Sequence, residues 1–212
     1  MTSALAVDIW SDIACPWCFL GKRRFERALE RFDRPVEVEY HAFELAPDTP
    51  VDFEGSEIDF LVRYKGMPPD QVEQMLARMT GLGAGEGLRY DFTALRHTRT
   101  LLAHQAIQHA RTKGRQAELV ERLFHAYFEE GRHVGHADEL AALAEDVGLD
   151  GAELRDALAD GTHEKAVAED IALAHELGIN GVPFYVLDGR YAVSGAQSSD
   201  VFRMALARVA DG

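Results

Sequence analysis

The chain has 212 residues and carries 36 acidic against 22 basic side chains, which gives a formal net charge of −14. A surface this acidic repels phosphate groups, so we expect neither nucleic acid nor an anionic membrane surface as a partner. Hydrophobic residues make up 47% of the chain, which is ordinary for a globular protein. The length allows one domain with an insertion, or two small domains.

The N-terminal segment contains no basic region followed by a long apolar run, because Asp8 interrupts its only apolar stretch. No other stretch approaches the length that spans a bilayer, so we expect a cytoplasmic protein. The two cysteines, Cys15 and Cys18, form a single Cys-x-x-Cys pair. Because permanent disulfides are rare in a reducing compartment, such a pair indicates a reactive dithiol or a metal site.

The first part of the chain predicts a strand, a helix and a second strand. Residues 5–10 are mostly apolar and lead into a turn, and Pro16 then fits the first turn of a helix. Apolar residues between 25 and 32 recur at helical spacing. From Val36, apolar and polar residues alternate, which predicts a strand that ends near Leu45. The Cys-x-x-Cys pair therefore lies where the first strand gives way to a helix.

The middle of the chain, from about residue 47 to 160, predicts helices. Amphipathic stripes run over residues 119–128 and 140–147, and Asp150 is placed to cap a further short helix. The glycines at 81, 83, 85 and 87 lack the Lys-Ser/Thr that follows a phosphate-binding loop, so we interpret them as a flexible connection.

The end of the chain returns to strands. Thr162 is placed to cap a helix that ends near Leu177, and residues 183–187 and 191–194 flank an Asp188-Gly189 turn signal. A final helix follows. The whole pattern predicts an α/β fold whose sheet is built from both ends of the chain.

A dithiol at the start of a helix suits disulfide exchange. The unpaired backbone N–H groups and the positive end of the helix dipole stabilise a thiolate at Cys15, which we expect to be the exposed, attacking thiol. Cys18, one turn later on the same face, is expected to be the more buried, resolving thiol. Pro16 stiffens the turn, and Trp17 offers an apolar surface beside the active sulfur.

Three other interpretations of the cysteines stay open. A structural disulfide across one helical turn closes almost no loop and stabilises little. Two buried, unreactive cysteines are also common in protein cores. A zinc ion is the third alternative, because His133-x-x-His136 offers two imidazoles to complete a Cys2His2 set. We favour the dithiol and expect no metal.

The chain resembles the DsbA family of thiol–disulfide oxidoreductases, and within it the FrnE-like group. The similarity rests on three segments: Asp12-Ile13-Ala14-Cys15-Pro16-Trp17-Cys18 with the following Phe19-Leu20-Gly21, Phe43-Glu44-Leu45, and Gly181-Val182-Pro183-Phe184. The resemblance implies a thioredoxin-like domain, residues 1–47 and 161–212, with a helical domain inserted at 48–160. It also implies a cis Val182–Pro183 bond that brings the Val182 backbone to the sulfurs.

The resemblance assigns further residues to the site. Pro16, Trp17, Val182, Pro183 and His104 are expected to contact the substrate, and Cys15 and Cys18 to be catalytic. Arg99 stands where the FrnE-like segment before His104 tends to carry Asn, which is a departure from that pattern. Asp12 is either a proton relay or a turn residue that binds its own backbone.

The expected activity is that of a protein disulfide oxidoreductase or dithiol–disulfide isomerase, acting on protein or peptide thiols and disulfides. No cofactor is expected, because the two sulfurs carry the electrons, although glutathione is a potential co-substrate. The alternative is a glutathione-dependent isomerase or transferase of the 2-hydroxychromene-2-carboxylate isomerase or kappa-class type. Those proteins use serine where Cys15 stands. The sequence leaves open the direction of electron flow, the recycling partner, and whether the protein is a monomer or a homodimer.

Overall fold

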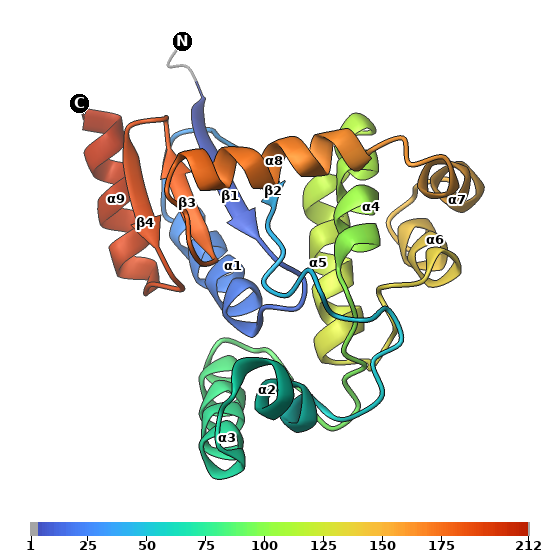
Figure 1. The fold of residues 1–212 in the computed structure, drawn as a ribbon. Coiled ribbons are helices and arrows are strands. Elements are labelled where there is room, and N and C mark those ends of the chain that lie inside the picture. The colour runs from blue at the N-terminus through green and yellow to red at the C-terminus, as the bar shows by residue number, and fades with distance from the viewer. Residues whose placement is uncertain (1–3, 212) are drawn as a thin grey trace. The chain divides into compact units, whose positions relative to one another are not determined.

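The fold is that of a computed structural model, in which residues 4–211 are described (Figure 1). The chain divides into two compact units. Unit 1 is built from the two ends of the chain, Met1–Leu45 and Lys165–Gly212, and unit 2 is the continuous middle segment Ala46–Glu164.

Unit 1 is organised around a four-stranded sheet. Its strands are β1 (Leu5–Ser11), β2 (Val36–Ala42), β3 (Phe184–Leu187) and β4 (Tyr191–Ser194), in the order β2-β1-β3-β4. β1 runs parallel to β2 and antiparallel to β3, and β3 and β4 form an antiparallel hairpin. The α/β plan with a sheet from both chain ends is therefore confirmed.

The turn between β3 and β4 is the one that the sequence indicates. Asp188 and Gly189 both have a left-handed backbone, with φ of 53° and 64°. Two successive residues of this kind match the right-handed twist of the flanking strands, and Asp-Gly tolerates the conformation well. β2 is shorter than expected. It ends at Ala42, and the N–H of Leu45 donates to the Asp12 carboxylate rather than to a neighbouring strand.

Two helices pack against one face of the sheet. They are α1 (Pro16–Leu29) and α9 (Ser199–Asp211), which contact each other along their length. Phe25 of α1, Phe202 of α9 and Tyr185 of β3 form a three-ring cluster with centroids 4.6–5.3 Å apart. Each of these rings is fully buried, so this cluster is the centre of the unit 1 core.

Helix α8 (Glu164–Glu176) supplies the packing around Trp10, which points to the other side of β1 from Ile9 because side chains alternate along a strand. The Trp10 indole N–H donates to the Asp170 carbonyl at 3.1 Å. The first helical residue is Glu164, so Thr162, expected as the cap, lies instead in the turn that precedes the helix.

A buried histidine lies beside this packing. The ring of His41 stacks on Trp10 and lies between two carboxylates, with Nδ1 2.8 Å from Asp170 Oδ1 and Nε2 2.9 Å from Asp8 Oδ1. Burial acts to lower the pKa of His41, but the hydrogen bonds to Asp170 and Asp8 outweigh it and raise the pKa above its usual value.

Unit 2 is helical. It contains α2 (Glu57–Lys65), α3 (Pro69–Gly85), α4 (Leu101–Thr112), α5 (Gln116–Phe128), α6 (Ala137–Glu145) and α7 (Gly151–Ala159). Asp150 caps α7 as predicted, because its carboxylate accepts the N–H groups of Ala152 and Glu153. Within residues 4–211, no helix is long and apolar enough to cross a membrane.

The glycine-rich stretch is not a flexible connection. Gly81, Gly83 and Gly85 all lie within α3. A Cβ atom at Gly83 would meet the ring of Tyr90 at 2.4 Å, so that position must be small for the ring to pack against the helix. Close packing, rather than backbone freedom, is therefore the reason for a glycine at position 83. The composition of the segment alone does not distinguish these two reasons for a glycine.

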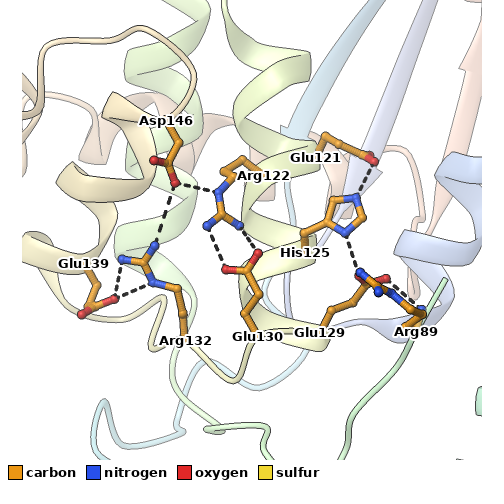
Figure 2. A network of polar contacts seen from close by, with 9 residues as sticks. All are labelled: Arg89, Glu121, Arg122, His125, Glu129, Glu130, Arg132, Glu139 and Asp146. Carbon is orange, nitrogen blue, oxygen red and sulfur yellow. Dashed lines mark hydrogen bonds and ion pairs between the residues drawn. The ribbon is translucent and has the colours of Figure 1, made fainter.

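A network of ion pairs connects α5, the segment that follows it and α6 (Figure 2). Arg122 binds both carboxylate oxygens of Glu130 at 2.8 Å and also donates to Asp146 at 2.8 Å. Arg132 extends the network through Glu139 at 2.9 Å. A bidentate arginine within a network fixes a surface better than isolated pairs do, so these contacts orient the segment between the two helices.

Candidate active site

Cys15 lies at the junction between β1 and α1. It is the N-cap residue of α1, with an extended backbone (φ −93°, ψ 109°), and Pro16 follows as the first helical residue. The Cys15 carbonyl accepts from Cys18 N–H at 2.9 Å, which closes the first turn. No side chain caps this helix start, so the Cys15 sulfur lies at the positive end of the helix.

The Val182–Pro183 peptide bond is cis, as the resemblance implies. The Cys15 thiol donates to the Val182 carbonyl oxygen, with 3.6 Å between sulfur and oxygen. These residues meet because β3 pairs with β1 in the register Trp10↔Phe184, which carries the loop before β3 to the start of α1. The sheet therefore positions both halves of the site.

The two thiols are almost equally buried. Cys15 is 3% exposed and Cys18 is 2% exposed, and both are described as free thiols. The expectation that Cys15 is an exposed thiol is therefore wrong for this state of the protein, because the Val182 carbonyl faces its sulfur. Trp17, in contrast, is exposed.

The pKa of the Cys18 thiol is raised well above its usual value. Burial is the main cause, and the hydrogen bond and charge of Cys15 add to it. The Asp12 backbone and the Ser11 side chain act in the opposite direction as hydrogen-bond partners. Ser11 was not singled out from the sequence, although its place as the last residue of β1 could have suggested that it borders the dithiol.

The Asp12 carboxylate is buried and binds two backbone groups. Oδ1 accepts from Ala14 N–H at 3.2 Å, and Oδ2 accepts from Leu45 N–H at 2.8 Å. These bonds hold the turn before Cys15 and tie it to the segment that follows β2. The turn-residue interpretation therefore has direct structural support, while the proton-relay role stays a prediction.

Tyr185 is a further residue of the site that the sequence analysis missed. Its side chain is fully buried, and its hydroxyl has no hydrogen-bond partner among residues 4–211. A Cβ atom at Gly21 of α1 would lie 2.6 Å from this hydroxyl and 3.0 Å from Pro183 Cγ. Burial, followed by the charges of Tyr40 and Cys18, raises the pKa of Tyr185 well above its usual value, so the phenol stays protonated.

The predicted substrate contact His104 and the His133-x-x-His136 segment lie in unit 2. His104 is a buried residue of α4, and its contact with substrate stays a prediction. His133 and His136 gather with Asp52 into a group of potential ligands, and neither cysteine belongs to that group within the described part of the chain. A zinc site that joins these histidines to Cys15 and Cys18 stays an untested alternative.

Unit 1 thus combines a four-stranded sheet, a helix that begins at a dithiol, and a cis-proline loop beside the first sulfur. That combination defines a thioredoxin-like fold carrying a dithiol at its helix start. Residues 6–207 match the family model of the DSBA-like thioredoxin domain. The chain belongs to this family, which confirms the resemblance found in its sequence.

Relatives of known sequence or structure agree with this assignment. The uncharacterized protein YwbO of Bacillus subtilis (strain 168) is 32% identical over 202 residues, which cover 94% of each chain. The probable DsbA oxidoreductase SCO1869 from Streptomyces coelicolor is 37% identical, with a TM-score of 0.92 over 98% of this chain and 90% of that one. The cytosolic disulfide reductase DsbM from Pseudomonas aeruginosa, solved with GSH, is 20% identical, with a TM-score of 0.69 over 98% and 100%.

Proposed function

We propose that this protein is a thiol–disulfide oxidoreductase that acts on peptide or protein disulfides through Cys15 and Cys18. The observation that carries the proposal is the position of the Cys15 sulfur. It lies at the N-cap of α1 and 3.6 Å from the Val182 carbonyl of the cis-proline loop. A sulfur at a helix N-cap, beside a backbone that an extended peptide can pair with, is placed to meet a substrate disulfide.

In the proposed reduction, the Cys15 thiolate attacks one sulfur of the substrate disulfide. A mixed disulfide forms, and the other substrate sulfur leaves as a thiolate that takes up a proton. Cys18 then loses its proton and attacks the Cys15 sulfur. The Cys15–Cys18 disulfide forms, the second substrate thiol leaves, and two electrons have passed from the protein to the substrate. Oxidation of a substrate dithiol is the same sequence in reverse.

The two cysteines suit different steps of this scheme. Because burial raises the pKa of Cys18, this thiol stays protonated while Cys15 reacts. The mixed disulfide adds no new charge near Cys18 and removes the neighbouring thiolate of Cys15, which makes deprotonation of Cys18 easier at that stage. The order of events therefore follows from the environments of the two thiols.

Residues around the sulfurs are proposed to hold the substrate. Trp17 is exposed next to the dithiol and offers an apolar face to a peptide. The Pro16 ring stiffens the helix start, and the backbone of Val182 before Pro183 runs past the Cys15 sulfur, where an extended peptide can pair with it. His104 is proposed as a further contact.

No cofactor is needed, because the dithiol itself carries the electrons. Glutathione is proposed as a co-substrate that returns the dithiol to its starting state, since DsbM was solved with GSH. The proposed location is the cytoplasm, because both cysteines of the chain belong to the reactive pair and none is left for a structural disulfide.

The test is reduction of insulin disulfides with dithiothreitol, comparing the wild type with Cys15→Ser and Cys18→Ser. We expect an active wild type and an inactive Cys15→Ser variant. Cys18→Ser should still attack the substrate disulfide; mixed with insulin in the absence of dithiothreitol, it should accumulate the mixed disulfide, which mass spectrometry detects as an adduct on Cys15. A fourth protein, which carries both Cys15→Ser and Cys18→Ser, contains no thiol and gives the background rate.

Equal activity of all four proteins would overturn the dithiol proposal. A parallel assay with glutathione in place of dithiothreitol tests the co-substrate. Glutathione-dependent turnover of a non-disulfide substrate that survives Cys18→Ser would instead favour the glutathione-dependent isomerase or transferase class.

A further inference from the structure

Three ligating side chains converge within unit 2 and have no part in the proposed dithiol chemistry. They are Asp52, His133 and His136, whose donor atoms all lie within 4.8 Å of one another. Asp52 Oδ1 lies 2.9 Å from His136 Nε2 and 3.6 Å from His133 Nε2. The two imidazole rings stack with centroids 3.8 Å apart and planes only 16° apart, so both rings present Nε2 to the same carboxylate.

The backbone that carries the histidines is closely packed. His133 and His136 flank a turn at Val134–Gly135, and His136 is the N-cap residue of α6. A Cβ atom at Gly135 would lie 2.1 Å from Thr98 Oγ1 and 3.0 Å from His133 Cε1. Only glycine fits there, so the turn holds the rings in place by packing. His133 is 6% exposed, which further restricts its ring.

We propose that Asp52, His133 and His136 bind a divalent transition-metal ion such as Zn²⁺. Two imidazole nitrogens and one carboxylate oxygen are the donors that Zn²⁺, Co²⁺ and Ni²⁺ accept. Asp52 and His136 are 76% and 47% exposed, so solvent completes the coordination shell. The sequence alone predicted no metal, because the His-x-x-His segment was considered only together with the cysteines.

Binding changes which nitrogen of His133 carries the proton and needs no redox step. Gly135 N–H donates to His133 Nδ1 at 3.2 Å, so the neutral ring carries its proton on Nε2, toward Asp52. The ion takes the place of that proton, which moves to Nδ1 and displaces the long hydrogen bond from Gly135. One weak contact is exchanged for a metal–nitrogen bond.

A bound ion would link two separate parts of unit 2. Asp52 belongs to the segment between β2 and α2, and the two histidines belong to the segment between α5 and α6. Because the three donors come together only in the folded unit, an ion that binds them stabilises the folded state.

The test uses untagged full-length protein that carries Cys15→Ser and Cys18→Ser, so that thiols cannot bind the ion. Zn²⁺ is added, excess is removed by gel filtration, and elemental analysis gives the bound metal, which we expect at about one ion per chain. Titration with Co²⁺ gives the affinity from visible absorption. His136→Ala and Asp52→Asn should each weaken binding about tenfold or more, since even outer-shell changes commonly have that effect.

Matched controls exclude nonspecific binding. His175→Ala removes an exposed histidine of α8, and Glu54→Gln removes an exposed acid two positions from Asp52; both should leave binding unchanged. Circular dichroism confirms that each variant is folded, and His136→Gln replaces His136→Ala if it is not. Absence of bound Zn²⁺, or equal binding by the His136, Asp52 and control variants, would overturn the proposal. Because the tested chain lacks both cysteines, the result is independent of the proposed oxidoreductase activity.

Discussion

Replacement of Gly21 by alanine tests whether the close packing under the active-site helix is as the structure describes it. A Cβ atom there would lie 2.6 Å from the Tyr185 hydroxyl, 3.0 Å from Pro183 Cγ and 3.4 Å from the Ala196 Cα. Alanine favours a helix over glycine by about 1 kcal/mol, whereas overpacking a full core costs about 1–3 kcal/mol. The net loss of unfolding free energy in Gly21→Ala is therefore expected to be about 0–2 kcal/mol, and the packing penalty itself about 1–3 kcal/mol.

Gly81→Ala is the matched control. Gly81 is also helical, but nothing lies within 4 Å of its Cβ position, so this variant should gain the helix propensity of about 1 kcal/mol without the clash. Urea denaturation followed by circular dichroism measures both variants. The difference between them isolates the packing penalty at Gly21.

The double variant Gly21→Ala with Tyr185→Phe identifies the atom responsible. Removing the hydroxyl removes the 2.6 Å contact, so we expect the two substitutions to be coupled by about 0.5–2 kcal/mol in the favourable direction. The reasoning is refuted if Gly21→Ala proves as stable as Gly81→Ala. It is also refuted if the effects of the two substitutions are strictly additive in the double variant. Insulin reduction should fall in Gly21→Ala, because the added Cβ atom also lies 3.0 Å from Pro183 Cγ of the cis-proline loop.

Three other variants give shorter tests. The folded-state pKa of His41 is raised, so the contribution of His41 to stability is fully present below about pH 6.5 and is lost as the pH rises through the raised value. Asp170→Asn should flatten this decline, which urea midpoints measured across that pH range report. A wild type that grows more stable with rising pH in this window would contradict the assignment. Asp12→Ala leaves two partly buried N–H groups, those of Ala14 and Leu45, without their acceptor, and should cost about 1–3 kcal/mol in the same denaturation assay. Asp150→Ala removes the cap of α7 and should lower the unfolding free energy by about 0.5–2 kcal/mol; an unchanged midpoint would show that the cap contributes nothing.

The features that the sequence predicts well depend on local chemistry. The alternation of β2, the Asp188-Gly189 turn and the Asp150 cap each follow from neighbouring residues, and the structure contains all three. The place of Cys15 at a helix start follows in the same way from Pro16 and the preceding strand.

The features that the sequence does not predict depend on contacts between distant segments. Tyr90 packs against Gly83 of α3, and nothing within the glycine stretch itself indicates that ring. The buried Cys15 thiol donates to the Val182 carbonyl, which is 167 positions away in the chain. Tyr185 is brought to the dithiol by the pairing of β3 with β1, which a single sequence does not display.

The division of the chain has a consequence for the order of folding during synthesis. Unit 2 is one continuous segment, so all of its residues are available before the last quarter of the chain has been made. Strand β1 emerges first, yet its second neighbour, β3, begins only at Phe184. Until then one side of β1 offers unpaired N–H and C=O groups, which is the kind of edge that pairs with other chains. We therefore expect ribosome-bound intermediates that end within unit 2 to be bound by chaperones along β1, and to be released once the β3–β4 hairpin has been translated.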